Sequence, residues 1–104
     1  MTARALLVED DHSIALVITA ALEDDGFAVD ACDSIAGRDR LLAERAYDVM
    51  LTDVVLTDGD GIETLGDVHA AHPAMPIIIL SAQNTLDTAV RASDTGAVEY
   101  FPKP

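Results

Sequence analysis

Apolar segments alternate with amphipathic segments along the whole chain. Most apolar segments are nearly continuous, as in strands buried on both faces, whereas 27–31 alternates apolar and polar residues like a half-buried strand near a sheet edge. The expected strands are 5–8, 27–31, 48–53, 76–80 and 98–101. In the intervening segments, apolar residues recur three and four positions apart, which predicts helices. The expected helices are 14–22, 34–45, 62–69 and 86–93.

This alternation of strands and helices predicts an α/β fold with an open, doubly wound parallel sheet. Asp11 or Ser13 can cap the first helix, and Gly26 can end it in a left-handed conformation. A parallel sheet needs cover on both faces, but no helix follows the last expected strand. We therefore expect a single domain, 1–104, truncated before a fifth helix, with apolar surface exposed beside the first helix and the first and fifth strands.

Composition narrows the class of protein. The chain has 104 residues and a formal net charge of −13, so it lacks the cationic surface that nucleic acid or an anionic membrane requires. A hydrophobic share of 50% is too high for a disordered acidic segment. Cys32 is the only cysteine, the start does not resemble a signal peptide, and no apolar run reaches the ~20 residues of a membrane span. We expect a cytoplasmic domain that binds neither nucleic acid nor membrane.

Candidate chemistry gathers where the expected strands end. In an open α/β sheet the functional crevice lies outside these carboxyl ends. The residues there are Glu9, Asp10, Asp53, Ser81 and Lys103, the chain's only lysine. Clustered carboxylates repel one another unless a cation joins them, and oxygen ligands favour a hard ion such as Mg²⁺. Carboxylates, a hydroxyl and an ammonium around a metal would suit a phosphoryl group.

These residues, in this order and spacing, resemble the receiver domain of two-component response regulators. Glu9-Asp10, Asp53, Ser81-Ala82 and Lys103-Pro104 follow the first, third, fourth and fifth strands, so the resemblance covers essentially the whole chain. It implies a flavodoxin-like, five-stranded parallel sheet in the order 2-1-3-4-5. It also implies a phosphoacceptor that catalyses its own phosphorylation and autodephosphorylation, rather than a turnover enzyme.

The resemblance assigns roles around a bound Mg²⁺. Asp53 would be the phosphoacceptor, Asp10 would bind the metal directly and Glu9 would bind it through water. The backbone carbonyl of Val55 would be a further metal ligand.

It also assigns roles around the phosphoryl group. Ser81 would bond a phosphoryl oxygen and move toward it on activation, Lys103 would pair with it, and Tyr100 would change rotamer. The Lys103–Pro104 peptide bond would be cis.

The end of the chain, including Gly96-Ala97 and the run from Tyr100 to Pro104, most resembles receivers of the NtrC class. This class implies a sensor histidine kinase as phosphoryl donor and a transcription-regulating output domain that is absent here. A homodimer is a further possibility. One departure is Leu56-Thr57 where the family usually has Met-Pro, and Thr57 does not fix its own φ as proline does.

Other interpretations stay open from the sequence. Asp10 and Asp11 could both serve only to cap a helix, and Asp58 and Asp60 are typical turn residues. A phosphatase with an aspartyl nucleophile would have Asp-x-Asp-x-Thr after the first strand, which the segment 10–14 does not match. A stand-alone receiver acting through protein interaction is the third alternative.

Overall fold

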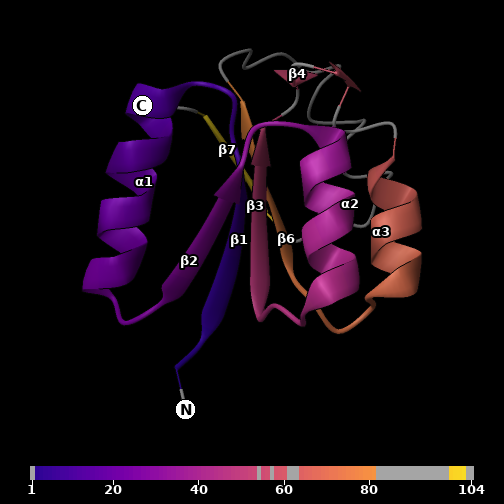
Figure 1. Ribbon diagram of the computed structural model, residues 1–104, viewed down its shortest axis with the longest axis horizontal. Coiled ribbons are helices and arrows are strands. Elements are labelled where there is room, and N and C mark those ends of the chain that lie inside the picture. The colour runs from indigo at the N-terminus through magenta and orange to yellow at the C-terminus, as the bar shows by residue number, and fades with distance from the viewer. Residues whose placement is uncertain (1, 54, 57, 61–63, 82–98, 103–104) are drawn as a thin grey trace.

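The computed structural model describes residues 2–53, 55–56, 58–60, 64–81 and 99–102 (Figure 1). The helices are α1 His12–Asp24, α2 Ile35–Glu44 and α3 Leu65–Ala71. The long strands are β1 Arg4–Val8, β2 Ala28–Cys32, β3 Val49–Asp53, β6 Ile77–Ser81 and β7 Glu99–Pro102. Two short strands are β4 Val55–Leu56 and β5 Gly59–Asp60. The helix expected at 86–93 lies outside the described residues.

The long strands form one parallel sheet in the order β2-β1-β3-β6-β7. β6 and β7 are the fourth and fifth long strands along the chain, so the predicted order 2-1-3-4-5 is confirmed. β2 lies at the edge of this sheet and is only half-buried, as its alternating sequence indicates. β6, the most apolar segment, has a neighbour on each side.

Helices lie on both faces of the sheet, α2 and α3 on one and α1 on the other (Figure 1). Alternate residues of β1 point to opposite faces, and both sets are fully buried. Leu6 and Val8 belong to the apolar cluster under α2 and α3, whereas Ala5 and Leu7 belong to the one under α1. Burial on both faces explains why this segment is continuously apolar.

Local polar contacts fix the ends of α1 and the start of α2. The Asp11 carboxylate accepts hydrogen bonds from the backbone N–H groups of Ser13 and Ile14, at 2.9 and 3.1 Å, and is the N-cap of α1. Gly26, with φ of 95°, turns the chain after this helix as expected. Ser34 caps α2 by accepting a hydrogen bond from the Gly37 N–H at 3.0 Å.

The short hairpin of β4 and β5 differs from the sequence prediction, which had only turn residues at 57–61. It is antiparallel, with Val55 opposite Asp60 and Leu56 opposite Gly59. Leu56 is buried in the same apolar cluster as Leu6, which explains why this segment packs against the core. Strands of two residues are too short to show periodicity, so the pattern could not predict them.

Among the residues that the structure describes, no helix is both long enough and apolar enough to cross a membrane. α3 begins at Leu65, and the residues just before Thr64 that the sequence assigned to this helix lie outside the described ranges.

Candidate functional site

The sheet brings three predicted carboxylates together. β1 and β3 are parallel neighbours, and Val8 lies opposite Thr52. Glu9 and Asp53 follow these two residues, so they leave the sheet at the same edge. One ligand oxygen each from Glu9, Asp10 and Asp53 lies within 4.8 Å of the others. We call these three residues the acidic cluster.

Two members of the acidic cluster are buried and one is exposed. Glu9 and Asp53 are only 3% and 5% exposed, whereas Asp10 faces solvent. The Glu9 N–H donates to the Cys32 carbonyl at 2.9 Å, which extends the pairing of β1 with β2 by one residue. At the end of β3, the buried Thr52 hydroxyl donates to the Asp53 carbonyl at 3.0 Å. The sheet therefore holds the backbone beneath both buried carboxylates.

The two aspartates after Glu9 have separate positions. Asp11 caps α1 with its carboxylate, and its own N–H donates to Glu9 Oε1 at 3.2 Å. Asp10 lies in the acidic cluster instead. The interpretation in which both aspartates only cap the helix therefore does not describe Asp10.

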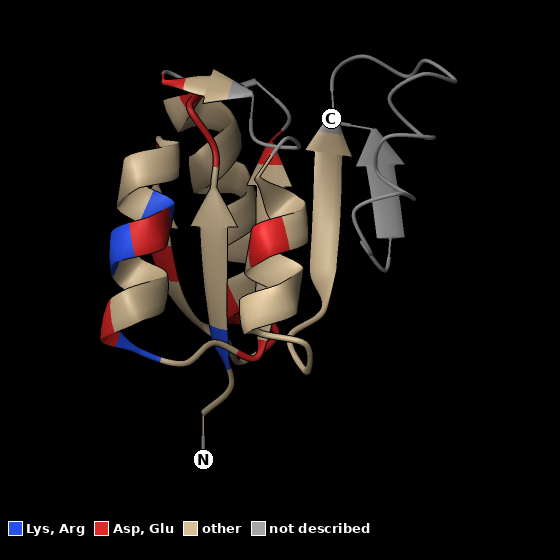
Figure 2. Ribbon diagram, turned by 90° about the vertical axis from the view of Figure 1, so that its right-hand side faces the viewer, with Lys and Arg blue, Asp and Glu red and all other residues tan. Residues whose placement is uncertain are grey.

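The donor set of the acidic cluster fits a hard divalent cation. All the available ligand atoms are carboxylate oxygens, and the burial of two of them strengthens their mutual repulsion when they are ionised. A cation of charge two would offset most of that repulsion. The arginines in the described part of the chain lie on α2, just after it, and at the start of β1 (Figure 2), and Arg40 of α2 lines a cavity together with Glu9.

The other predicted site residues are placed only through their backbones or lie outside the described residues. Val55 begins β4, two residues after Asp53. Ser81 ends β6 one residue beyond Leu80, the partner of Asp53, so its backbone reaches the same edge. Tyr100 is in β7 opposite Ile79. Lys103 and the Lys103–Pro104 bond lie outside the described ranges, and the roles of all four residues stay predictions.

A cavity of about 620 Å³ opens beside Glu9, and its lining includes His12, Cys32, Ser34 and Arg40. Burial raises the pKa of the Cys32 thiol to about 11, and the nearby negative charge of Asp33 adds to the effect. The thiol is therefore protonated at neutral pH and is not an activated nucleophile. The sequence pattern did not predict this cavity, because its lining comes from two separate segments, 9–15 and 31–40, that meet only in the fold.

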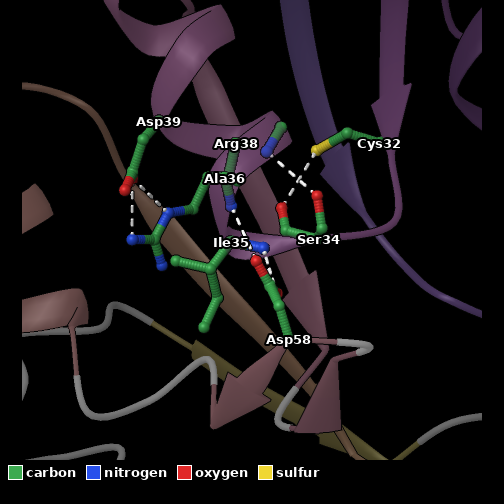
Figure 3. Close-up of polar contacts among 8 residues, drawn as sticks. Cys32, Ser34, Ile35, Ala36, Arg38, Asp39 and Asp58 are labelled. Carbon is green, nitrogen blue, oxygen red and sulfur yellow. Dashed lines mark hydrogen bonds and ion pairs between the residues drawn. The ribbon is translucent and has the colours of Figure 1, made fainter.

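The contact of Asp58 with α2 was also not predicted from the sequence, in which Asp58 is a typical turn residue. The Asp58 carboxylate accepts hydrogen bonds from the backbone N–H groups of Ile35 and Ala36, at the start of α2 (Figure 3). These bonds lower the pKa of the Asp58 carboxyl. Partners separated by more than twenty residues leave no local sequence signal.

Comparisons with known proteins agree with this geometry. Residues 5–104 match the family described as the response regulator receiver domain. The DNA-binding transcriptional regulator NtrC of Azospirillum brasilense is 40% identical over 105 residues, which cover 100% of this chain but 22% of that protein. The chain thus spans about a fifth of the length of this curated relative.

Solved structures of the same fold cover nearly all of the chain. A CheY-like response regulator receiver domain from Methanospirillum hungatei has a TM-score of 0.93 and 27% identity, covering 100% of this chain and 83% of that one. A response regulator from Burkholderia pseudomallei, solved with a phosphorylated aspartic acid and a calcium ion, has a TM-score of 0.92. The Burkholderia pseudomallei protein is 24% identical, and the match covers 98% of this chain and 60% of that one. This similarity therefore shows the fold alone. The chain belongs to the response regulator receiver domain family of two-component systems and is similar to the receiver portion of regulators of the NtrC class.

Proposed function

We propose that Asp53 accepts a phosphoryl group from the phosphohistidine of a sensor histidine kinase, at a Mg²⁺ site built on the acidic cluster. The observation that carries this proposal is the convergence of Glu9, Asp10 and Asp53 at one sheet edge. The phosphorylated aspartic acid and calcium ion in the Burkholderia pseudomallei protein support the same chemistry for this fold.

In the proposed transfer, an Asp53 carboxylate oxygen attacks phosphorus, a new O–P bond forms and the P–N bond of the phosphohistidine breaks. The imidazole leaves with the electron pair of that bond. Bound Mg²⁺ would neutralise charge on the transferring oxygens. Asp10 would bind the metal directly, Glu9 would bind it through water, and the Val55 carbonyl would add a backbone oxygen.

The remaining residues of the proposal act on the product. Ser81 would donate its hydroxyl to a phosphoryl oxygen, and the Lys103 ammonium would pair with the added negative charge. Movement of Ser81, with a rotamer change of Tyr100, would favour the second of two surface conformations. An output domain of the NtrC class, outside this chain, would recognise that surface in the cytoplasm, and a homodimer would be one way to transmit the change.

The experiment uses a small phosphoryl donor in place of the kinase. Incubation with acetyl phosphate or phosphoramidate and Mg²⁺ is expected to add one phosphoryl group, detected by intact-protein mass spectrometry. Asp53→Asn is expected to abolish the adduct because the amide is not a nucleophile of this kind. EDTA is expected to prevent its formation in the unchanged chain. Asp10→Asn is expected to raise the Mg²⁺ concentration required.

Asp25→Asn is the matched control, since Asp25 is an exposed aspartate beyond the far end of α1. It is expected to form the adduct like the unchanged chain. Steady release of phosphate without an adduct would instead indicate a phosphatase. No adduct and no Mg²⁺ binding would indicate a module that acts through protein interaction alone, and either result would overturn the proposal.

A further inference from the structure

The hairpin that follows Asp53 is attached to a helix far from it in sequence. Asp58 Oδ1 accepts a hydrogen bond from the Ile35 N–H at 2.7 Å, and Oδ2 accepts one from the Ala36 N–H at 3.1 Å (Figure 3). One side chain thus bonds two successive N–H groups at the start of α2. Because both oxygens are used, this attachment fixes the orientation of Asp58 as well as its distance from the helix.

The start of α2 is suited to this contact. The first N–H groups of a helix have no partner inside it, and the helix dipole favours a negative charge at that end. The Ser34 hydroxyl accepts from the Gly37 N–H, whereas the Asp58 carboxylate accepts from the N–H groups of Ile35 and Ala36. The lowered pKa of Asp58 agrees with a carboxylate stabilised by these backbone donors.

A close approach of the backbone reinforces the attachment. Gly59 has φ of 148°, a conformation that other residues rarely adopt, and a Cβ at this position would lie 3.4 Å from Ile35 Cδ1. The Ile35 side chain therefore lies near the turn next to Asp58. The start of α2 thus places an apolar side chain, as well as two N–H donors, beside the hairpin.

The hairpin carries one of the expected metal ligands, Val55, which lies outside the large parallel sheet. Glu9 and Asp10 directly follow β1, and Asp53 is the last residue of β3. Val55 instead lies in β4, whose sole strand partner among the described residues is β5. The position of its backbone therefore depends on how the hairpin is held. Buried Leu56 anchors one side, and Asp58 anchors the turn.

We propose that Asp58 is a positioning residue for the metal site, because its two bonds to α2 hold the β4–β5 hairpin and hence the backbone of Val55 in place beside the acidic cluster. This inference rests on the proposed function, which makes the Val55 carbonyl a metal ligand. Asp58 itself contacts neither the metal nor the phosphoryl group in this proposal.

The test compares variants that remove different hydrogen bonds from the start of α2. Asp58→Ala removes the bonds to Ile35 and Ala36, whereas Ser34→Ala removes the bond to Gly37 and leaves the hairpin attached. With Mg²⁺ as the only probe, Asp58→Ala is expected to raise the Kd about tenfold, as residues that orient metal ligands do. Asp58→Asn keeps one acceptor oxygen, so its Kd for Mg²⁺ is expected to lie between those of the unchanged chain and Asp58→Ala. Ser34→Ala is expected to leave the Kd unchanged within about twofold.

A second measurement does not depend on the variants. If the hairpin links the metal to α2, Mg²⁺ must stabilise the Asp58 bonds by the same coupling free energy by which those bonds strengthen Mg²⁺ binding. Saturating Mg²⁺ is expected to slow hydrogen exchange of the Ile35 and Ala36 amides in the unchanged chain, and to leave the Gly37 amide unaffected. Thermal unfolding followed by circular dichroism shows that each variant is folded before its Kd is compared.

The outcomes separate the two proposals. If the unchanged chain binds no Mg²⁺ and forms no Asp53 adduct, the proposed function fails and this inference fails with it. If the unchanged chain does both, equal Mg²⁺ affinity in folded Asp58→Ala and Ser34→Ala would overturn the positioning role alone. Equal weakening in both variants would overturn it too, because the loss would then follow the helix start rather than the hairpin.

Discussion

Local contacts give neighbouring residues of this receiver domain different roles. Asp10 and Asp11 have the same side chain, but Asp11 is held by two N–H groups of α1 while Asp10 lies in the acidic cluster. The same principle applies to Tyr47, whose hydroxyl donates to Asp30 at 2.8 Å. Burial, together with this bond, raises the pKa of Tyr47 to about 12. Local contacts rather than residue type decide these roles.

The Cys32 thiol gives a prediction at this scale. Its pKa of about 11, against an ordinary value of 9.0, leaves roughly 100-fold less thiolate at neutral pH. Alkylation by iodoacetamide in the folded chain is expected to be at least that much slower than in urea. The rate in the folded chain is expected still to rise with pH at about pH 10. Because Cys32 is the only cysteine, mass spectrometry reports this site alone. A folded-state rate that levels off near pH 9 would contradict the raised pKa.

The sequence predicts the long buried strands better than it predicts the short hairpin. β1, β3 and β6 are buried between layers, so continuous apolar segments identify them, and the carboxylates after β1 and at the end of β3 identify the sheet edge. The β4–β5 hairpin has no comparable pattern. Its packing depends on the burial of Leu56 and on the attachment of Asp58 to α2, which are tertiary contacts.

The same contrast holds within a helix. Arg38 is only 1% exposed and is paired with Asp39 at 2.8 Å, although an arginine in an amphipathic helix ordinarily faces solvent. The pattern predicts where α2 lies, because its apolar spacing is local. It does not predict the burial of Arg38, because that depends on what packs against the helix.

Two glycines provide a matched test of element ends. Gly26 follows α1 with φ of 95°, and a Cβ there would touch nothing within 4 Å, so Gly26→Ala adds backbone strain without a clash. We expect a loss of about 1–2 kcal/mol in the free energy of unfolding. Gly66 in α3 has equal space but needs no left-handed conformation, so Gly66→Ala is expected to stabilise the chain by up to ~1 kcal/mol.

Urea denaturation measures both effects. The two variants add the same methyl group, so their difference reports backbone conformation. Equal free energies of unfolding for Gly26→Ala and Gly66→Ala would show that the left-handed turn after α1 is not required.

At the scale of the whole molecule, the acidity has two separable parts. The net charge of −13 acts through general repulsion, which any salt screens. The acidic cluster is a local repulsion that a divalent cation would relieve directly. The two parts therefore respond differently to the kind of cation present.

Thermal unfolding in NaCl and in MgCl₂ distinguishes the general repulsion from the local repulsion of the acidic cluster. NaCl is expected to raise Tm modestly by screening. MgCl₂ at equal ionic strength, present at a hundred times its Kd, is expected to add ~2.7 kcal/mol, or more than ~10 °C for a chain of this size. Asp53→Asn is expected to raise Tm without metal, because it removes one repelling charge, and to reduce the additional effect of Mg²⁺. The same response to both salts would count against a specific site.

The proposed site residues also differ in when they are translated. β1 and β3 lie side by side in the interior of the sheet. Glu9 and Asp10 follow β1 and Asp53 ends β3, so all three residues belong to the first 53 positions of the chain. Ser81 and Lys103, which would hold the phosphoryl oxygens, come later. During synthesis from the N-terminus, the ribosome therefore adds the three carboxylates of the proposed cation site before the residues that would hold the phosphoryl group. On the proposed function, the ligands for the cation precede those for the anion along the chain.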